Sequence, residues 1–175
     1  MDIAENDKAI ADYNQAIKLE PNDADFYTNR GGAYQKKYDY DRAIADYGQA
    51  IKLDPNHVGA YNNRGVVYSK KGDSDRAIAD FSQAIKLDPN HAVAYNNRGL
   101  AYYGTGDSDQ AIADFGQAIK HDPNYASPYN NRGTAYVIKG DYNRAIADLE
   151  TALLLEPNNA NAKENLDFAR QQLGR

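Results

Sequence analysis

The sequence predicts an all-α protein, a solenoid of stacked helix–turn–helix hairpins, and three observations support this. Five of the six prolines are spaced 34 residues apart, at Pro21, Pro55, Pro89, Pro123 and Pro157. The phrase Ala-Ile-Ala-Asp recurs five times with that period, and Tyr-Asn-Asn-Arg-Gly recurs three times. Within each period, apolar residues are spaced three or four positions apart, which is typical of amphipathic helices. A hairpin of two such helices cannot bury its apolar face alone, so neighbouring hairpins must stack.

Each period contains the signals that end one helix and begin the next. Gly72 suits the left-handed residue just past the end of a first helix. Asp73 or Ser74 can then cap the second helix. Pro89 ends that helix, because proline cannot continue a helix interior, and Asn90 is the expected cap of the helix that follows.

These signals divide the chain, taken as a single solenoid domain over residues 1–175, into about ten helices and no strands. Residues 5–20 form a lone second helix, a half repeat. Four full repeats follow, at 24–57, 58–91, 92–125 and 126–159. Residues 160–173 form a final helix that is polar enough to cap a repeat array. The chain is expected to be a piece of a longer repeat array, because it begins with half a repeat.

One residue set makes the repeat specific: Tyr61, Gly65, Tyr68, Ala77, Phe81, Ala84 and Pro89. With this set at these offsets, the period resembles the tetratricopeptide repeat, in near-consensus repeats of the bacterial type over residues 5–159. The sequence departs from the family at the residue before the glycine, where arginine replaces the commoner leucine. The resemblance implies a right-handed superhelix whose first helices line a concave groove.

The aromatic residues at helical spacing are interpreted as core. Gly65 is expected to face Ala77 across the hairpin, and Ala84 is expected to meet the next repeat. Small residues at these positions let two helices approach to about 8 Å.

Arginine and aspartate recur in step, one on each helix of a repeat. Arg30, Arg64, Arg98 and Arg132 lie on the first helices, and Asp46, Asp80, Asp114 and Asp148 on the second, with Asp12 in the half repeat. Planar guanidinium groups favour bidentate carboxylate contacts, so structural ion pairs are predicted. A row of arginines that binds an anionic ligand remains the alternative.

Asparagines recur in the middle of the first helices, where helix propensity does not explain them. The resemblance places them along the concave groove, like the asparagine ladder of some members of the family. Carboxamides both donate and accept, so such a ladder can hold the backbone of a peptide. The predicted ladder comprises Asn29, Asn62, Asn63, Asn96, Asn97, Asn130 and Asn131. Retention after duplication of one repeat is the alternative explanation.

Residues that vary between repeats along this inferred groove are expected to set selectivity. They are Lys36, Val66, Lys70, Leu100, Tyr103, Thr134, Val137 and Ile138. The groove therefore changes from polar, with lysines, to apolar. This composition also argues against the two-carboxylate clamp of chaperone-binding relatives, whose groove lysines and arginines are absent apart from scattered lysines.

The sequence indicates no enzyme, metal site or cofactor. It has no cysteine, and its three histidines leave few nucleophile–base pairs. His57 and His91 are expected to be solvated loop residues about one helix layer apart, too far to share a metal ion. The acidic pair Asp73 and Asp75, like its counterparts in other repeats, lacks the spacing of a calcium loop and is interpreted as helix-capping.

The expected partner is a protein or peptide held in the groove, and the expected role is that of an interaction scaffold. A formal net charge of −5 without a basic block argues against nucleic acid. No apolar run is long enough to cross a membrane, and no signal peptide is recognised, so a cytoplasmic location is the default. The alternative function is a structural module whose open ends stack, with weak end-to-end self-association.

Overall fold

The structure, a computed structural model, describes residues 3–174 and contains ten helices and no strand within that range. This confirms the all-α prediction. The helices are α1 (Ile3–Leu19), α2 (Ala24–Lys36), α3 (Tyr40–Leu53), α4 (Val58–Lys70), α5 (Ser74–Leu87), α6 (Ala92–Gly104), α7 (Ser108–His121), α8 (Ala126–Ile138), α9 (Tyr142–Leu155) and α10 (Ala160–Gln172).

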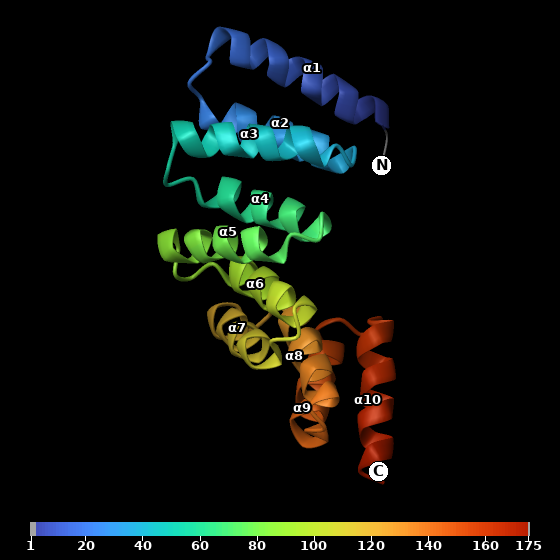
Figure 1. The fold of residues 1–175 in the computed structure, drawn as a ribbon. Helices are drawn as coiled ribbons and strands as arrows, with labels where there is room; N and C mark the ends of the chain where they lie inside the picture. Colours follow the sequence, from blue (N-terminus) through green and yellow to red (C-terminus); the bar gives the residue numbers. More distant parts are fainter. Residues whose placement is uncertain (1–2, 175) are drawn as a thin grey trace. The chain divides into compact units, whose positions relative to one another are not determined.

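The helices form two compact units, which meet in the chain between Pro89 and Asn90. In the first unit, α2 packs on α3 and α4 on α5, while α1 lies against α2 (Figure 1). In the second unit, α6 packs on α7 and α8 on α9, and α10 covers both α8 and α9 (Figure 1). Each unit is thus built of two stacked hairpins with one further helix, and the extent of the chain as one domain stays a prediction.

The second helices begin at the predicted aspartates. The side chain of Asp73 accepts a hydrogen bond from the backbone N–H of Arg76, at 3.1 Å, and is the N-cap of α5. The N-caps of α3, α7 and α9 are the equivalent residues Asp39, Asp107 and Asp141. The acidic residues that open these helices therefore include the predicted caps.

Two first helices are capped by histidine. The sequence predicted asparagine as the cap and histidines exposed to solvent. His57 and His91 are the N-caps of α4 and α6, and their Nδ1 atoms accept from the backbone N–H groups of Ala60 and Ala94, at 3.2 and 3.3 Å. The expectation of Asn90 as the cap and of two solvated loop histidines is therefore wrong. Nδ1 lies as far from Cα as the Oδ1 of asparagine does, so imidazole can serve the same orphan N–H groups.

The turn inside each hairpin uses a left-handed residue. Gly72, Gly106 and Gly140 have φ values of 80°, 87° and 74°, as predicted for the first of them. In the first repeat the same place is occupied by Tyr38, with φ of 61°.

The hairpins close over one fully buried residue of each second helix. Tyr47, Phe81, Phe115 and Leu149 are at most 1% exposed. A Cβ at Gly65 would have atoms of the Phe81 ring as its nearest neighbours. Gly65 therefore packs most closely on Phe81, and not on Ala77 as expected. Tyr47, Phe81 and Phe115 are therefore core residues, which agrees with the prediction for the aromatic positions.

Candidate functional site

The four arginines of the first helices are bound to the aspartates of their own hairpins. Each guanidinium donates from Nε and Nη2 to the two carboxylate oxygens, at 2.6 to 2.8 Å. The aspartates are only 5–7% exposed. These hydrogen bonds raise the pKa of each arginine, so the guanidinium groups stay protonated. The predicted ion pairs are confirmed, and the arginines do not form an anion-binding row.

Arginine also reaches the preceding repeat. Arg30 Nη1 donates to Asn14 Oδ1 of α1 at 2.7 Å, in addition to its contact with Asp46. The residues that occupy the place of Asn14 in the later repeats are Gly48, Ser82, Gly116 and Glu150. This contact links two repeats through the same side chain that closes the hairpin.

A polar pocket of about 240 Å³ lies on the first-helix side of the first unit. Three predicted site residues line it: Asn29, Lys36 and Asn63. They are joined by Tyr13 of α1 and Thr28 of α2. Lys36 is exposed at the C-terminal end of α2, where a cation is favoured by the helix dipole.

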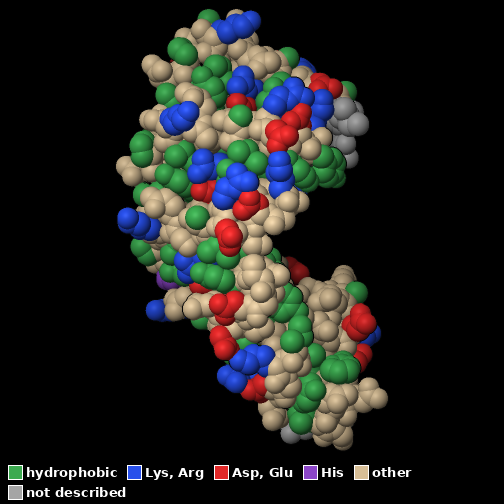
Figure 2. Space-filling view, in the orientation of Figure 1, with side chains coloured by type: hydrophobic (Ala, Val, Ile, Leu, Met, Phe, Trp, Pro, Cys, Tyr) green, Lys and Arg blue, Asp and Glu red, His purple; other side chains and the backbone are tan. Residues whose placement is uncertain are grey.

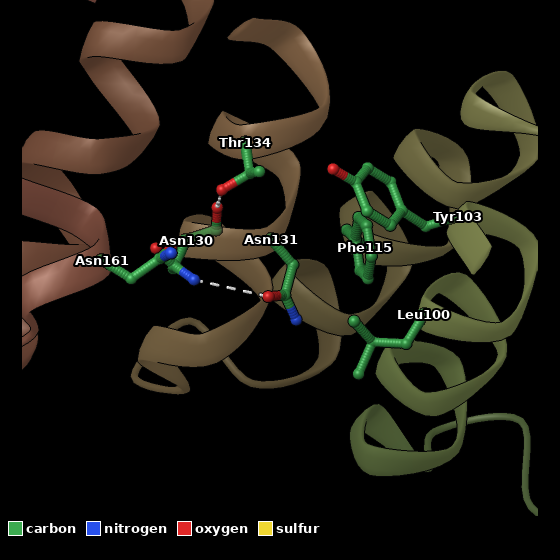
Figure 3. Close-up of a pocket in the computed structure, with 7 residues that line it drawn as sticks. All are labelled: Leu100, Tyr103, Phe115, Asn130, Asn131, Thr134 and Asn161. Atoms are coloured by element: carbon green, nitrogen blue, oxygen red, sulfur yellow. Dashed lines mark hydrogen bonds between the residues drawn. The ribbon is translucent and has the colours of Figure 1, made fainter. Parts of the chain in front are cut away.

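A second pocket, of about 300 Å³, lies within the second unit (Figure 3). In Figure 3, Leu100 and Tyr103 of α6 stand on one side, with Phe115 of α7 beside Tyr103. The polar residues of the opposite side are Asn130, Asn131 and Thr134 of α8 and Asn161 of α10. The pocket therefore joins an apolar wall to a wall of amides and one hydroxyl.

The asparagines of this unit form a hydrogen-bonded chain between repeats. Asn131 Nδ2 donates to Asn96 Oδ1 of the preceding repeat at 3.0 Å, and Asn130 Nδ2 donates to Asn131 Oδ1 at 3.4 Å. Asn96 is 3% exposed and donates to the Tyr125 hydroxyl at 3.3 Å. Asn96 is thus packed between repeats, whereas Asn130 and Asn131 both line the pocket.

The remaining predicted residues lie outside the two pockets. Asn62 is 9% exposed and donates to Asn63 at 3.4 Å, so it resembles Asn96 in being a packing residue. Val137 packs against the core around Leu149. The others lie on the first helices, half-buried in the case of Val66 and Asn97 and exposed in the case of Lys70 and Ile138.

Sequence reasoning missed Asn161 and Asn165 of α10. Asn165 continues the spacing of 34 residues set by Asn29, Asn63, Asn97 and Asn131, so the period itself was a usable signal. Its side chain donates to Thr134 Oγ1 at 2.9 Å and to Asn161 Oδ1 at 3.2 Å. The last helix therefore contributes to the pocket as well as covering the core.

The described residues contain no group of three or more acidic, histidine or cysteine side chains that could hold a metal ion. None of the helices within residues 3–174 combines the length and the apolar character that crossing a membrane requires. On the face shown in Figure 2, basic and acidic side chains lie beside one another in both units. The ion pairs between repeats include those of Lys37 with Asp7 and of Lys139 with Asp109.

Stacked helix–turn–helix hairpins that repeat every 34 residues define the class of helical-repeat proteins. The tetratricopeptide-repeat model matches residues 58–91, 92–125 and 126–159, and a second model, described as TPR repeat, matches residues 5–37 and 39–72. The chain belongs to the tetratricopeptide-repeat family. No curated protein matches it.

Solved structures of this family resemble the chain. A crystal structure of MamA is 28% identical, with a TM-score of 0.80, and the match covers 90% of this chain and 92% of that one. YrrB, described as a TPR protein with an unusual peptide-binding site, is 24% identical, with a TM-score of 0.75 over 93% and 84% of the two chains. The first TPR of Spaghetti (RPAP3), bound to the HSP90 peptide SRMEEVD, is 30% identical, with a TM-score of 0.67 over 70% and 97%.

Proposed function

We propose that the chain is a protein-interaction scaffold, without catalytic activity, that binds an extended peptide along its first helices. The second asparagines of the repeats hold the peptide backbone, and the residues that vary between repeats select its side chains. The proposal draws on the pockets of the two units, each lined by asparagine from first helices.

The observation that carries the proposal is the state of Asn131. Its Nδ2 donates to Asn96 of the preceding repeat and its Oδ1 accepts from the adjacent Asn130, so both contacts fix the orientation of the amide. An amide has two N–H groups and two lone pairs, so one of each is left for a ligand. A side chain that is already ordered loses little entropy when it binds a peptide.

The relatives support a peptide as the ligand class. RPAP3 has its first TPR domain bound to one chaperone peptide and its second, in the human protein, in complex with another. The proposed selectivity differs between the units of this chain, because Lys36 lines the first pocket whereas Leu100 and Tyr103 line the second. We expect acidic or polar residues to be preferred at the first pocket and apolar ones at the second.

A peptide array selects ligands for the full chain, and calorimetry then compares variants. Asn63→Ala and Asn131→Ala each remove about two hydrogen bonds, so each should weaken every selected peptide by about 1–3 kcal/mol, roughly 5- to 150-fold. Leu100→Ala should instead change the ranking of peptides. Asn143→Ala, at an exposed site on the second helix α9, is the control. Unchanged affinity of folded Asn63→Ala and Asn131→Ala proteins would show the proposal to be wrong.

A further inference from the structure

The carbonyl oxygen of the Asn130 side chain is buried and has no hydrogen-bond partner among the described residues. Its counterpart one repeat earlier, Asn96 Oδ1, accepts from Asn131 Nδ2 at 3.0 Å. By the period of 34 residues, Asn165 is the residue expected to donate to Asn130 Oδ1. The asparagine chain therefore lacks one link, at the last repeat.

The missing link has a local cause. The side-chain N–H groups of Asn165 go to Thr134 Oγ1 and Asn161 Oδ1 instead, at 2.9 and 3.2 Å. Neither Thr134 nor Asn161 recurs in the other repeats. The position of Thr134 is occupied there by Gly32, Val66 and Leu100. The position of Asn161 is occupied by Asp25, Gly59, Val93 and Ser127. The lone pairs of Thr134 Oγ1 are available to Asn165, because the hydroxyl group donates its hydrogen to the Asn130 backbone carbonyl at 2.8 Å.

Asn130, whose Oδ1 has no partner within residues 3–174 and whose Nδ2 donates to Asn131, lines the pocket of the second unit (Figure 3). A buried acceptor without a donor is unfavourable, so a ligand that brings a donor recovers the loss. The opposite wall offers Leu100 and Tyr103, to which an apolar group can pack. None of the lining residues is charged, so a charged donor would lose its hydration without an opposite charge nearby.

We propose that this pocket is a subsite for an aliphatic group joined to a neutral amide, whose N–H donates to Asn130 Oδ1. In a peptide, this is an aliphatic side chain together with an adjacent backbone N–H. The inference rests on the proposed function for its biological ligand, but the subsite itself is tested with a small molecule. Thr134 is a positioning residue here, because it holds Asn165 away from Asn130.

The test uses two probes of closely similar shape, N-methyl-4-methylpentanamide and methyl 4-methylpentanoate, titrated into the full chain and followed by NMR. Both have the branched alkyl group, but only the amide has an N–H. The amide should bind about tenfold more tightly than the ester, on the scale of one hydrogen bond to a buried acceptor. Its binding should shift the signals of Leu100, Tyr103 and the Asn130 side-chain amide.

Thr134→Val removes the acceptor that holds Asn165, so Asn165 can donate to Asn130 and the preference for the amide should disappear. Thr151→Val is the matched control, because Thr151 makes the same contact, to the Ala147 carbonyl at 2.9 Å, on α9 away from the pocket. Equal binding of amide and ester by the unmodified chain, or no binding of either, overturns the inference. A preference that persists in a folded Thr134→Val protein also overturns it.

The two proposals fail in different ways. If selected peptides depend on Asn63 and Asn131 but are indifferent to Thr134→Val, the subsite is wrong and the scaffold function stands. If no peptide binds while the amide is preferred over the ester, the subsite stands and the scaffold function is wrong.

Discussion

Gly65 lies directly against the ring of Phe81: a Cβ at Gly65 would be 2.7 Å from Cε1 and 2.9 Å from Cδ1 of that ring. The same relationship recurs between Gly99 and Phe115, at 2.7 Å. Because Phe81 is 1% exposed, its ring has no free space to move into. The two helices of a hairpin can therefore approach this closely because the residue at this position has no Cβ.

Gly65→Ala should destabilise the protein although alanine is the better helix former. Overpacking costs about 1–3 kcal/mol, which exceeds the gain of about 1 kcal/mol in helix propensity. The free energy of unfolding in urea measures the difference. Gly104→Ala is the control, since nothing lies within 4 Å of a Cβ at Gly104, and it should be neutral or stabilising. Equal effects of the two substitutions would contradict the close-packing argument.

Gly48→Asn should stabilise the link between the first two full repeats. A Cβ at Gly48 would be 3.7 Å from Arg64 Nη1, and Asn14 already makes the corresponding bond to Arg30. One added hydrogen bond and the better helix propensity together predict a gain of about 1 kcal/mol. Gly48→Val has a helix propensity close to that of asparagine but offers no hydrogen-bond acceptor, so thermal unfolding should place the asparagine variant above it. A valine variant of equal stability would show that no bond to Arg64 forms.

Tyr38→Gly should stabilise the first full repeat. Tyr38 holds the left-handed backbone, with φ of 61°, that glycine adopts in the other three hairpin turns, and its side chain is 77% exposed. Relief of the left-handed strain is worth about 1–2 kcal/mol, partly offset by the edge contact of Tyr38 with Tyr40 at 6.3 Å. Chemical denaturation measures the change. The reciprocal substitution Gly72→Tyr should lose stability, and a gain there would refute the assignment of strain.

We expect one residue of α10, Asp167, to oppose end-to-end stacking of chains. To complete a hairpin with α1 of another molecule, α10 would need glycine where the repeats have Gly31 and Gly65, but it has Asp167, which is exposed. Because even a Cβ clashes at that position within the hairpins, Asp167→Gly should increase concentration-dependent association, as measured by sedimentation velocity. Asp167→Ala retains the Cβ and should not. Strong association of the unmodified chain, or equal behaviour of both variants, would show that this residue is not the barrier.

Acid should weaken the N-caps of the second helices. Hydrogen bonds from Arg42, Arg76 and Arg144 hold the pKa of Asp39, Asp73 and Asp141 below the ordinary value. A carboxyl group with a lowered folded-state pKa binds protons less readily than in the unfolded chain. Its contribution is thus present above about pH 4 and is lost as the pH falls through the folded-state pKa. Urea unfolding at a series of pH values should show a shallower acid slope for Arg76→Gln, and an unchanged slope would contradict this cause.

Local sequence patterns were sufficient to predict the repeat, the helices and much of the pairing between helices. Periodicity and caps act within a few residues, so Gly72, Asp73 and Pro89 were enough to bound the helices. The ion pair of Arg64 and Asp80 was also predictable, because two charges that recur in step on adjacent helices must face each other in every repeat or in none.

The roles of the individual asparagines depend on contacts between helices and could not be predicted from local patterns. Asn96 and Asn131 are both mid-helix amides in the sequence, yet one is buried between repeats and the other lines a pocket. Asn165 has the spacing of 34 residues that would continue the hydrogen-bonded chain of asparagines, but its side chain donates to Thr134 and not to Asn130. An amide can rotate toward any acceptor within reach, and which acceptor is near depends on side chains from other helices. The choice of acceptor depends on the tertiary structure, so it cannot be read from a local pattern of residues.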